Sequence, residues 1–116
     1  MNDVVGVQIE EQFLSLPREK REAIITHGAA FLLADLRNRL FLAESKIRFF
    51  EEKYLASLSQ LDADGLPDGA GWEIHEDYIL WHHWAQVAEE ARHDIACLEG
   101  ITQRGLHLME LPHVGQ

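Results

Sequence analysis

Apolar residues recur at alternating spacings of three and four along two long stretches of the chain. In the first stretch they are Leu33, Leu36, Leu40, Ala43, Ile47, Phe50, Tyr54 and Leu61, with Ser57 as the single break. In the second they are Trp81, Trp84, Ala88, Ala91, Ile95 and Leu98, extended upstream by Ile74 and Tyr78. Because this spacing gathers apolar side chains on one face of a helix, it predicts two long helices, near residues 17–61 and 73–102.

The segment between the two helices, residues 62–71, is acidic and contains three glycines and a proline, which a helix does not tolerate. A turn there gives an all-α fold, a long antiparallel helical hairpin that resembles a coiled coil. Ser15 and Pro17 are typical of a helix start. The expected organisation is therefore an N-terminal arm over residues 1–16, a hairpin domain over 17–102 and a tail over 103–116. In the arm, the β-branched stretch Val4–Ile9 predicts a short strand that pairs with a symmetry mate.

The two apolar stripes can be aligned, and this alignment predicts the hairpin core. In the register that places Phe50 opposite Trp81, large side chains face small ones at the waist and aromatic side chains cluster near the turn. A register in which the two stripes are shifted by one heptad stays an alternative. The predicted core consists of Leu33 opposite Leu98, Leu36 opposite Ile95, Leu40 opposite Ala91, Ala43 opposite Ala88, Ile47 opposite Trp84, and Phe50 opposite Trp81.

The first helix carries more apolar surface than one hairpin buries. The residues off the stripe are Phe31, Phe41, Leu42 and Phe49. A helix that is apolar around most of its girth is covered on more than one side. We expect a second copy to cover this flank, which gives a homodimeric four-helix bundle, or else a different protein partner.

Charge separates the two halves of the chain. The whole sequence has ten Lys and Arg against twenty Asp and Glu, and from Asp62 to Glu99 ten acids stand against the single base Arg92. Such a segment repels phosphate backbones and attracts basic surfaces, which argues against nucleic-acid binding by this half. We expect Glu76, His82, Glu89 and Asp94 to contact a partner. The alternative is that the acids only keep the protein soluble.

Motifs of catalysis and metal binding are weak. The acidic loop has carboxylates at spacings typical of a calcium loop, but Leu66 and Pro67 occupy two key places. His75, His82, Glu89 and His93 share a stripe that could chelate zinc or nickel weakly, although a solvated polar face is the favoured interpretation. We expect no enzyme activity, no cofactor and no resident metal. The single cysteine, the lack of a signal peptide and the lack of a long apolar run point to a reducing cytoplasm.

Short motifs give the chain a family resemblance. The opening VVGVQI followed by LPREKREAIITHGAAFLLADL resembles the start of small bacterial antitoxins. The string IRFFEEKY at residues 47–54, the acidic Gly-containing linker and EIHEDYILWHHW at residues 73–84 are similar to small helical antitoxins of TumE/TumA-type toxin–antitoxin modules. The resemblance covers residues 35–100. In that group the Lys-Tyr pair precedes Gly and a short helix, whereas here Tyr54 precedes Leu-Ala-Ser-Leu, so the residue pattern favours one continuous helix.

The resemblance implies a non-enzymatic acidic protein that neutralises a small basic, ribonuclease-like toxin and has no catalytic residues. It also implies a paired N-terminal ribbon on operator DNA, here with Gln8 as the polar reader and Arg18, Lys20 and Arg21 as phosphate anchors. Two alternatives stay open: a dimeric helical adaptor without a toxin, and a weak metal-binding helical bundle.

Overall fold

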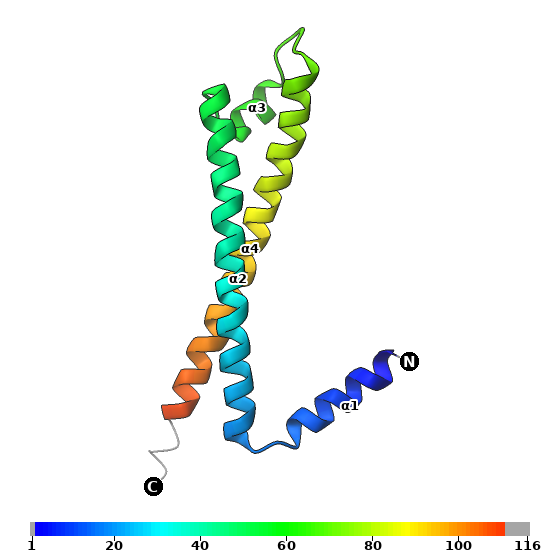
Figure 1. The fold of residues 1–116 in the computed structure, drawn as a ribbon, viewed down its shortest axis with the longest axis vertical. Helices are drawn as coiled ribbons and strands as arrows, with labels where there is room; N and C mark the ends of the chain where they lie inside the picture. Colours follow the sequence, from blue (N-terminus) through cyan, green and yellow to red (C-terminus); the bar gives the residue numbers. More distant parts are fainter. Residues whose placement is uncertain (1, 111–116) are drawn as a thin grey trace. The chain divides into compact units, whose positions relative to one another are not determined.

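A computed structural model describes the backbone of residues 2–110 and the side chains of residues 8–104. Four helices form in this part of the chain (Figure 1): α1 (Asn2–Leu14), α2 (Arg18–Tyr54), α3 (Leu58–Asp64) and α4 (Trp72–Glu110). No strand occurs within residues 2–110. The all-α hairpin prediction is therefore confirmed. None of these helices combines the length and apolarity needed to span a bilayer.

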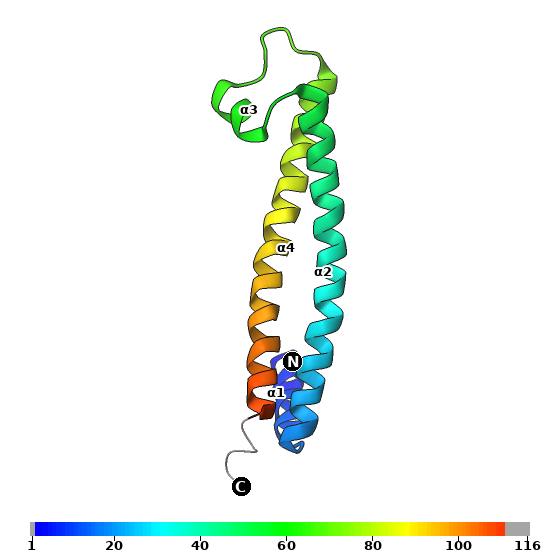
Figure 2. The ribbon, with the colours of Figure 1, turned by 90° about the vertical axis from the view of Figure 1, so that its left-hand side faces the viewer.

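The chain divides into two compact units, one of residues 1–33 with 97–116 and the other of residues 34–96. In the second unit, α2 and α4 run antiparallel and side by side, and α3 and the Gly-rich loop connect their ends (Figure 2). The fully buried Trp81 on α4 stacks on Phe50 of α2, with ring centroids 5.7 Å apart. This contact is the Phe50–Trp81 pairing that the sequence predicts.

The predicted core residues line the interior of the hairpin. In residues 34–96 the buried apolar side chains are those of Ala43, Phe50, Trp81, Ala88 and Ala91. The other members of the two stripes, Leu36, Leu40, Ile47, Trp84 and Ile95, are half-buried. In the first unit Leu33 is buried and Leu98 is half-buried. Each stripe thus faces inward, as its heptad spacing predicts.

The strand predicted at Val4–Ile9 is wrong, because these residues belong to α1. A lone strand leaves its backbone N–H and C=O groups without partners, whereas a helix satisfies them within its own segment. Ser15 does not cap α2 either: its hydroxyl donates to the carbonyl of Gln12 at the end of α1, over 2.6 Å. The Pro17 carbonyl instead accepts the first bonds of α2, from the amides of Lys20 and Arg21.

The long first helix ends earlier than its pattern predicts. Helix α2 stops at Tyr54, not Leu61, because Leu55 takes a left-handed conformation with φ 52°. The Ala56 amide then donates to the Glu51 carbonyl over 3.3 Å, which is the wrapping bond of a Schellman cap. Glycine is the usual residue at such a position, so Leu55 gave no sequence signal for the break.

Helix α3 fills part of the segment predicted as the end of the first helix and the start of the turn. Ser57 caps α3: its hydroxyl accepts from the Gln60 amide, and the Gln60 side chain accepts from the Ser57 amide. This reciprocal pair of hydrogen bonds is a capping box, and Ser57-x-x-Gln60 is its sequence motif. At the other end, α3 is capped by Gly65, which has φ 78° and whose amide donates to the Leu61 carbonyl. The helix is therefore a separate, well-capped element.

Helix α4 also extends further than predicted, to Glu110 instead of residue 102. Most of residues 103–110 are good helix formers, and Gly105 costs only about 1 kcal/mol in a helix interior. The last part of the predicted tail, residues 111–116, lies outside the described residues.

Candidate protein-binding surface

A groove runs between α2 and α4 in the unit of residues 34–96. It has a volume of about 360 Å³ and is lined by Leu36, Arg39 and Leu42 from α2 and by Trp84, Val87, Glu90, Ala91 and Asp94 from α4. Leu36 and Trp84 are half-buried members of the two inner stripes, whereas Leu42 is exposed. The groove therefore has an apolar floor, and its sides carry both apolar and charged side chains.

Apolar side chains extend this surface toward the Gly-rich loop. Phe49 follows Leu42 by seven residues on α2, and Val87 follows Leu80 by seven residues on α4. Leu42 and Val87 line the groove, and because residues seven apart lie on one side of a helix, Phe49 and Leu80 continue their two sides toward the loop. Leu42, Phe49 and Leu80 are exposed and Val87 is half-buried. We call these four residues the groove face.

Only two of the four predicted flank residues belong to the groove face. Phe41 is 68% exposed and lies about 100° around α2 from Leu42, so it points away from the groove. Phe31 is exposed and belongs to the other compact unit. The sequence reasoning missed Leu80 and Val87, although their heptad spacing on the second helix was a readable signal.

The side of the hairpin away from the groove is polar. Arg92 of α4 donates to Glu44 of α2 over 3.1 Å and lies 3.7 Å from Glu89. Glu44 is two residues, or about 200°, around α2 from Leu42. The hairpin thus separates a polar side, held by ion pairs, from the side that carries the groove face.

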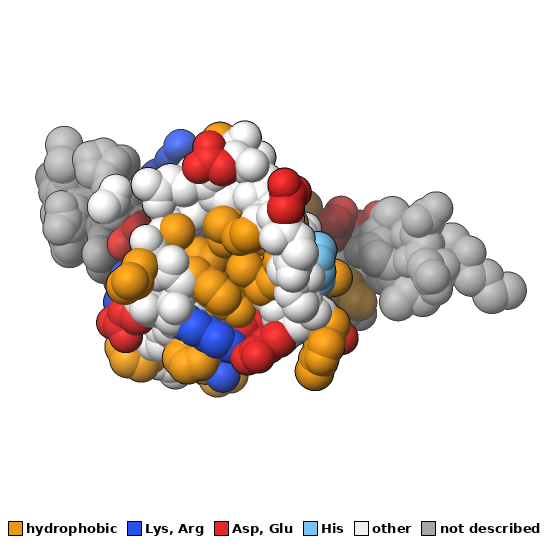
Figure 3. Space-filling view, turned by 90° about the horizontal axis from the view of Figure 1, so that it is seen from above, with side chains coloured by type: hydrophobic (Ala, Val, Ile, Leu, Met, Phe, Trp, Pro, Cys, Tyr) orange, Lys and Arg blue, Asp and Glu red, His pale blue; other side chains and the backbone are white. Residues whose placement is uncertain are grey.

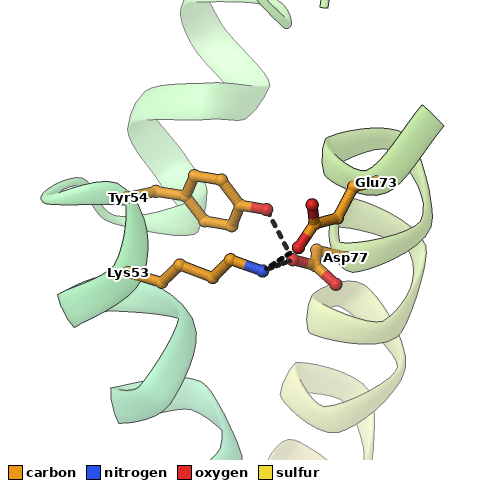
Figure 4. Close-up of polar contacts among 4 residues, drawn as sticks. All are labelled: Lys53, Tyr54, Glu73 and Asp77. Atoms are coloured by element: carbon orange, nitrogen blue, oxygen red, sulfur yellow. Dashed lines mark hydrogen bonds and ion pairs between the residues drawn. The ribbon is translucent and has the colours of Figure 1, made fainter. Parts of the chain in front are cut away.

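A second polar cluster joins the end of α2 to the start of α4 (Figure 4). The Lys53 ammonium lies 2.7 Å from Glu73 and 2.6 Å from Asp77, and the Tyr54 hydroxyl donates to the same Asp77 oxygen over 2.5 Å. The bonds from Lys53 and then Tyr54 lower the pKa of Asp77, and the bond to Asp77 raises the pKa of Lys53. Burial and the Asp77 carboxylate raise the pKa of Tyr54. We call Lys53, Tyr54, Glu73 and Asp77 the tip cluster.

A third cluster fixes α3 against α4. The Asp62 carboxylate accepts from the Tyr78 hydroxyl over 2.5 Å and lies 2.7 Å from His82 Nε2. The bonds from Tyr78 and then His82 lower the pKa of Asp62, and the same carboxylate raises the pKa of Tyr78. Asp62, the first acid of the loop that resembles a calcium loop, is therefore used within the fold.

Figure 3 looks down on the end of the hairpin that carries α3 and the loop. It shows hydrophobic side chains gathered at the centre, with acidic and basic side chains at the edge. In α3 and the loop, Leu58, Leu61 and Leu66 are half-buried. Apolar side chains are thus exposed at this end as well as along the flanks of the hairpin, and Leu55 and Trp72 are the most exposed of them at 90% and 75%.

The four residues predicted to contact a partner are all exposed, but they do not form one patch. His82 and Glu89 are seven residues apart and share the polar side of α4. Glu76 and Asp94 are eighteen residues, or five turns, apart and lie on a different side. Of the four, only Asp94 lines the groove. The acids therefore surround α4 instead of marking one face.

The histidine-rich stripe does not assemble a metal site among the described side chains. Within residues 8–104, no three His, Cys, Asp or Glu side chains lie close enough together to hold a metal ion. His75, His82, Glu89 and His93 are spread along α4, and His82 is engaged with Asp62. The arrangement favours a solvated polar side over a chelating one.

No protein-family model, curated protein or solved structure matches this chain.

Proposed function

We propose that this chain is a non-enzymatic protein-binding module of the cytoplasm that neutralises a small basic protein, in the manner of an antitoxin. One observation carries the proposal: the acids of residues 62–99 outnumber their cationic partners. Arg92, the one base of this segment, already pairs with Glu44 and Glu89. Lys53, which reaches the segment from α2, already pairs with Glu73 and Asp77. Exposed Glu76, Glu90 and Asp94 add further negative charge to α4.

A surface of this kind suits a partner that is itself basic. A protein that acts on RNA presents a positively charged surface, because it has to bind a phosphate backbone. The acids around α4 would steer such a protein onto the hairpin and occupy the place of the RNA. Association should therefore slow as salt rises, whereas dissociation should change little, because buried apolar contacts hold the complex once it has formed.

Co-expression with the neighbouring open reading frame tests the proposal. The expected result is that its small basic product arrests growth alone, is tolerated with this chain, and co-purifies with it. A neighbouring product that is harmless alone, or that does not co-purify, contradicts the proposal.

A charge variant tests which surface is used. Glu76→Gln combined with Glu89→Gln should reduce the association rate several-fold at low salt. The matched control is Glu10→Gln combined with Glu11→Gln, which removes the same charge from exposed positions on α1. If the control slows association as much as the α4 variant, net charge and not the α4 surface attracts the partner.

A second candidate function is a dimeric helical adaptor without a toxin, and the groove face favours it. Exposed apolar side chains on a well-formed hairpin are typical of a surface that another protein covers. A harmless neighbouring gene product, together with a chain that self-associates, would favour this adaptor function over the antitoxin.

A further inference from the structure

The groove face carries a charge pattern as well as apolar side chains. On the α2 side Arg39 lines the groove, and Lys46 follows it by seven residues on the same stripe. On the α4 side the groove is lined by Glu90 and Asp94. Arg39 lies 3.6 Å from Asp35, and Glu90 accepts from Gln86 over 3.0 Å. The α2 side of the groove therefore carries basic side chains and the α4 side acidic ones, and each side also carries apolar side chains.

A second copy of the chain fits this pattern in one orientation. When two hairpins stack face to face about a twofold axis parallel to the helices, α2 of each copy lies over α4 of the other, and the basic side chains of one copy meet the acidic side chains of the other. When the axis is perpendicular to the helices, α2 lies over α2 and α4 over α4, so like charges meet. Like charges placed opposite each other oppose association. Charge therefore selects the parallel axis.

The levels of the residues along the hairpin agree with the same axis. Arg39, Glu90 and Asp94 line one groove and so lie at the same level. A twofold axis parallel to the helices preserves level, and it brings Arg39 of the second copy against Glu90 and Asp94.

The apolar side chains match as well. Leu42 lies at the level of Val87 in the groove, and Phe49 and Leu80 lie one heptad nearer the loop on their helices. The same axis sets Leu42 against Val87, and Phe49 against Leu80, of the second copy. Every pair of adjacent helices in this assembly is antiparallel, as in an up-down-up-down four-helix bundle.

We infer that the groove face binds a second copy of this chain about a twofold axis parallel to the helices, so that α2 of each copy packs over α4 of the other. This surface shares Glu90 and Asp94 with the acidic surface of the proposed function, but it is tested by the oligomeric state of this chain alone and not by co-purification with a basic protein. An isologous interface of this kind closes at two copies and leaves the polar side of each hairpin open.

Sedimentation of the full chain at tens of micromolar tests the assembly. The parent should sediment at twice its 13.3 kDa mass. Phe49→Glu should give a monomer, because it places a charge in the apolar centre of the interface. Phe41→Glu is the matched control, since Phe41 and Phe49 are 68% and 57% exposed on the same helix and only Phe49 lies on the side of α2 that Leu42 presents to the groove. A parent that sediments as a monomer, or a Phe41→Glu variant that dissociates as fully as Phe49→Glu, overturns the inference.

Circular dichroism of each variant shows whether it folds. If Phe49→Glu loses its helical signal, Leu80→Glu on the α4 side of the groove face replaces it. A folded Leu80→Glu variant that remains dimeric also overturns the inference.

Charge reversal tests the orientation of the axis. Arg39→Glu alone, and Glu90→Lys with Asp94→Lys alone, should each raise the dimer dissociation constant by about tenfold. The triple variant that combines all three changes should return to the parent value, because the two sides of its groove are again opposite in charge. With the perpendicular axis the triple variant still places like charges together. A triple variant as weak as its components therefore overturns the proposed axis.

Discussion

Replacing Asp77 with asparagine tests whether the tip cluster stabilises the hairpin. One oxygen of Asp77 accepts from both the Tyr54 hydroxyl and the Lys53 ammonium, and the Asp77 side chain is only 15% exposed. Asparagine keeps the size of the side chain but removes its charge, so the change weakens these bonds without opening a cavity. Tyr54→Phe removes the Tyr54–Asp77 bond from the other side and leaves the ring that stacks on Trp81, 6.1 Å away between centroids.

The expected magnitude follows from the environment of the Tyr54–Asp77 bond. Hydrogen bonds to charged groups contribute about 1.5–3 kcal/mol where they are well shielded. Because both side chains are half-buried at the end of the hairpin, solvent screening lowers this value. We expect a coupling free energy of about 1 kcal/mol between Asp77→Asn and Tyr54→Phe, measured as the shortfall of the double variant from the sum of the singles.

Urea unfolding at neutral pH, followed by circular dichroism, measures the four corners of this cycle. Glu76→Gln is the matched control, because it removes an exposed carboxylate from the neighbouring position of α4 and should change the unfolding free energy by less than about 0.5 kcal/mol. The reasoning is refuted if the two changes simply add, or if the control destabilises the protein as much as Asp77→Asn.

The pH dependence of the same variant gives an independent measurement. The bonds from Lys53 and Tyr54 hold the pKa of Asp77 below its ordinary value of 3.8. The stabilisation that this carboxylate provides is thus complete above that ordinary value and is lost as pH falls through the lower pKa of the folded state. The difference in unfolding free energy between the parent and Asp77→Asn should therefore shrink between neutral pH and about pH 3. A difference that stays constant over this range would contradict the assignment.

Three further changes test the elements around the tip cluster, each by urea unfolding. Leu55→Gly should raise the unfolding free energy by about 1 kcal/mol, because Leu55 is exposed in a left-handed conformation that glycine adopts freely. Leu55→Ala should not raise the unfolding free energy, because alanine does not adopt this conformation freely. Ser57→Ala should lower it by about 1 kcal/mol through loss of the α3 cap, and Ser57→Thr should keep most of the stability. Trp81→Ala should lower the unfolding free energy by about 3–5 kcal/mol, because Trp81 is fully buried against Phe50. Trp81→Phe keeps an aromatic ring and should lower it by less. Equal losses in the two variants would count against ring stacking as the cause.

The inner surface of the hairpin was predictable because the hydrophobic effect decides which residues lie there. Burying a continuous apolar stripe outweighs the weaker local preferences, so heptad spacing alone identified the interior and the pairing of Phe50 with Trp81. The waist was readable for a related reason. Only small side chains let two helices approach closely, and Ala43, Ala88 and Ala91 are buried there.

The ends of the elements depend on smaller, local energies. The break after Tyr54 rests on a left-handed leucine, which carries no signature in a sequence. The start of α3 did carry one, in the Ser57–Gln60 capping box, but the continuing stripe concealed it. At the N-terminus, β-branched residues suggested a strand, and the backbone satisfied its hydrogen bonds in a helix instead.

The polar clusters could not be predicted, because they depend on how side chains lie across two helices. Tyr54 and Asp77 are 23 positions apart, and only the exact level and rotation of α2 and α4 bring them within 2.5 Å. The groove was only partly predictable from the sequence. Half of its apolar face, Leu42 and Phe49, followed from surplus apolar residues on one helix, whereas the other half needed the second helix in place.

The close waist and the exposed groove face have one physical cause, and this gives a last prediction. Within residues 34–96, three of the five buried apolar residues are alanines, which hold α2 and α4 close together but bury little apolar area each. The larger Leu42, Phe49 and Leu80 remain exposed on the single hairpin. A molecule that covers the groove face would therefore add hydrophobic stabilisation that the single hairpin does not have.

If that molecule is a second copy, folding is linked to association, and the thermal midpoint should rise with protein concentration. Phe49→Glu should abolish this dependence and lower the midpoint at high concentration, whereas Phe41→Glu should retain both the dependence and most of the midpoint. Calorimetric scans over a hundredfold range of concentration, on the order of micromolar to hundreds of micromolar, measure it. A parent midpoint that stays constant over this range would show that the hairpin is stable without a second copy, and the groove face would then be available to a different protein.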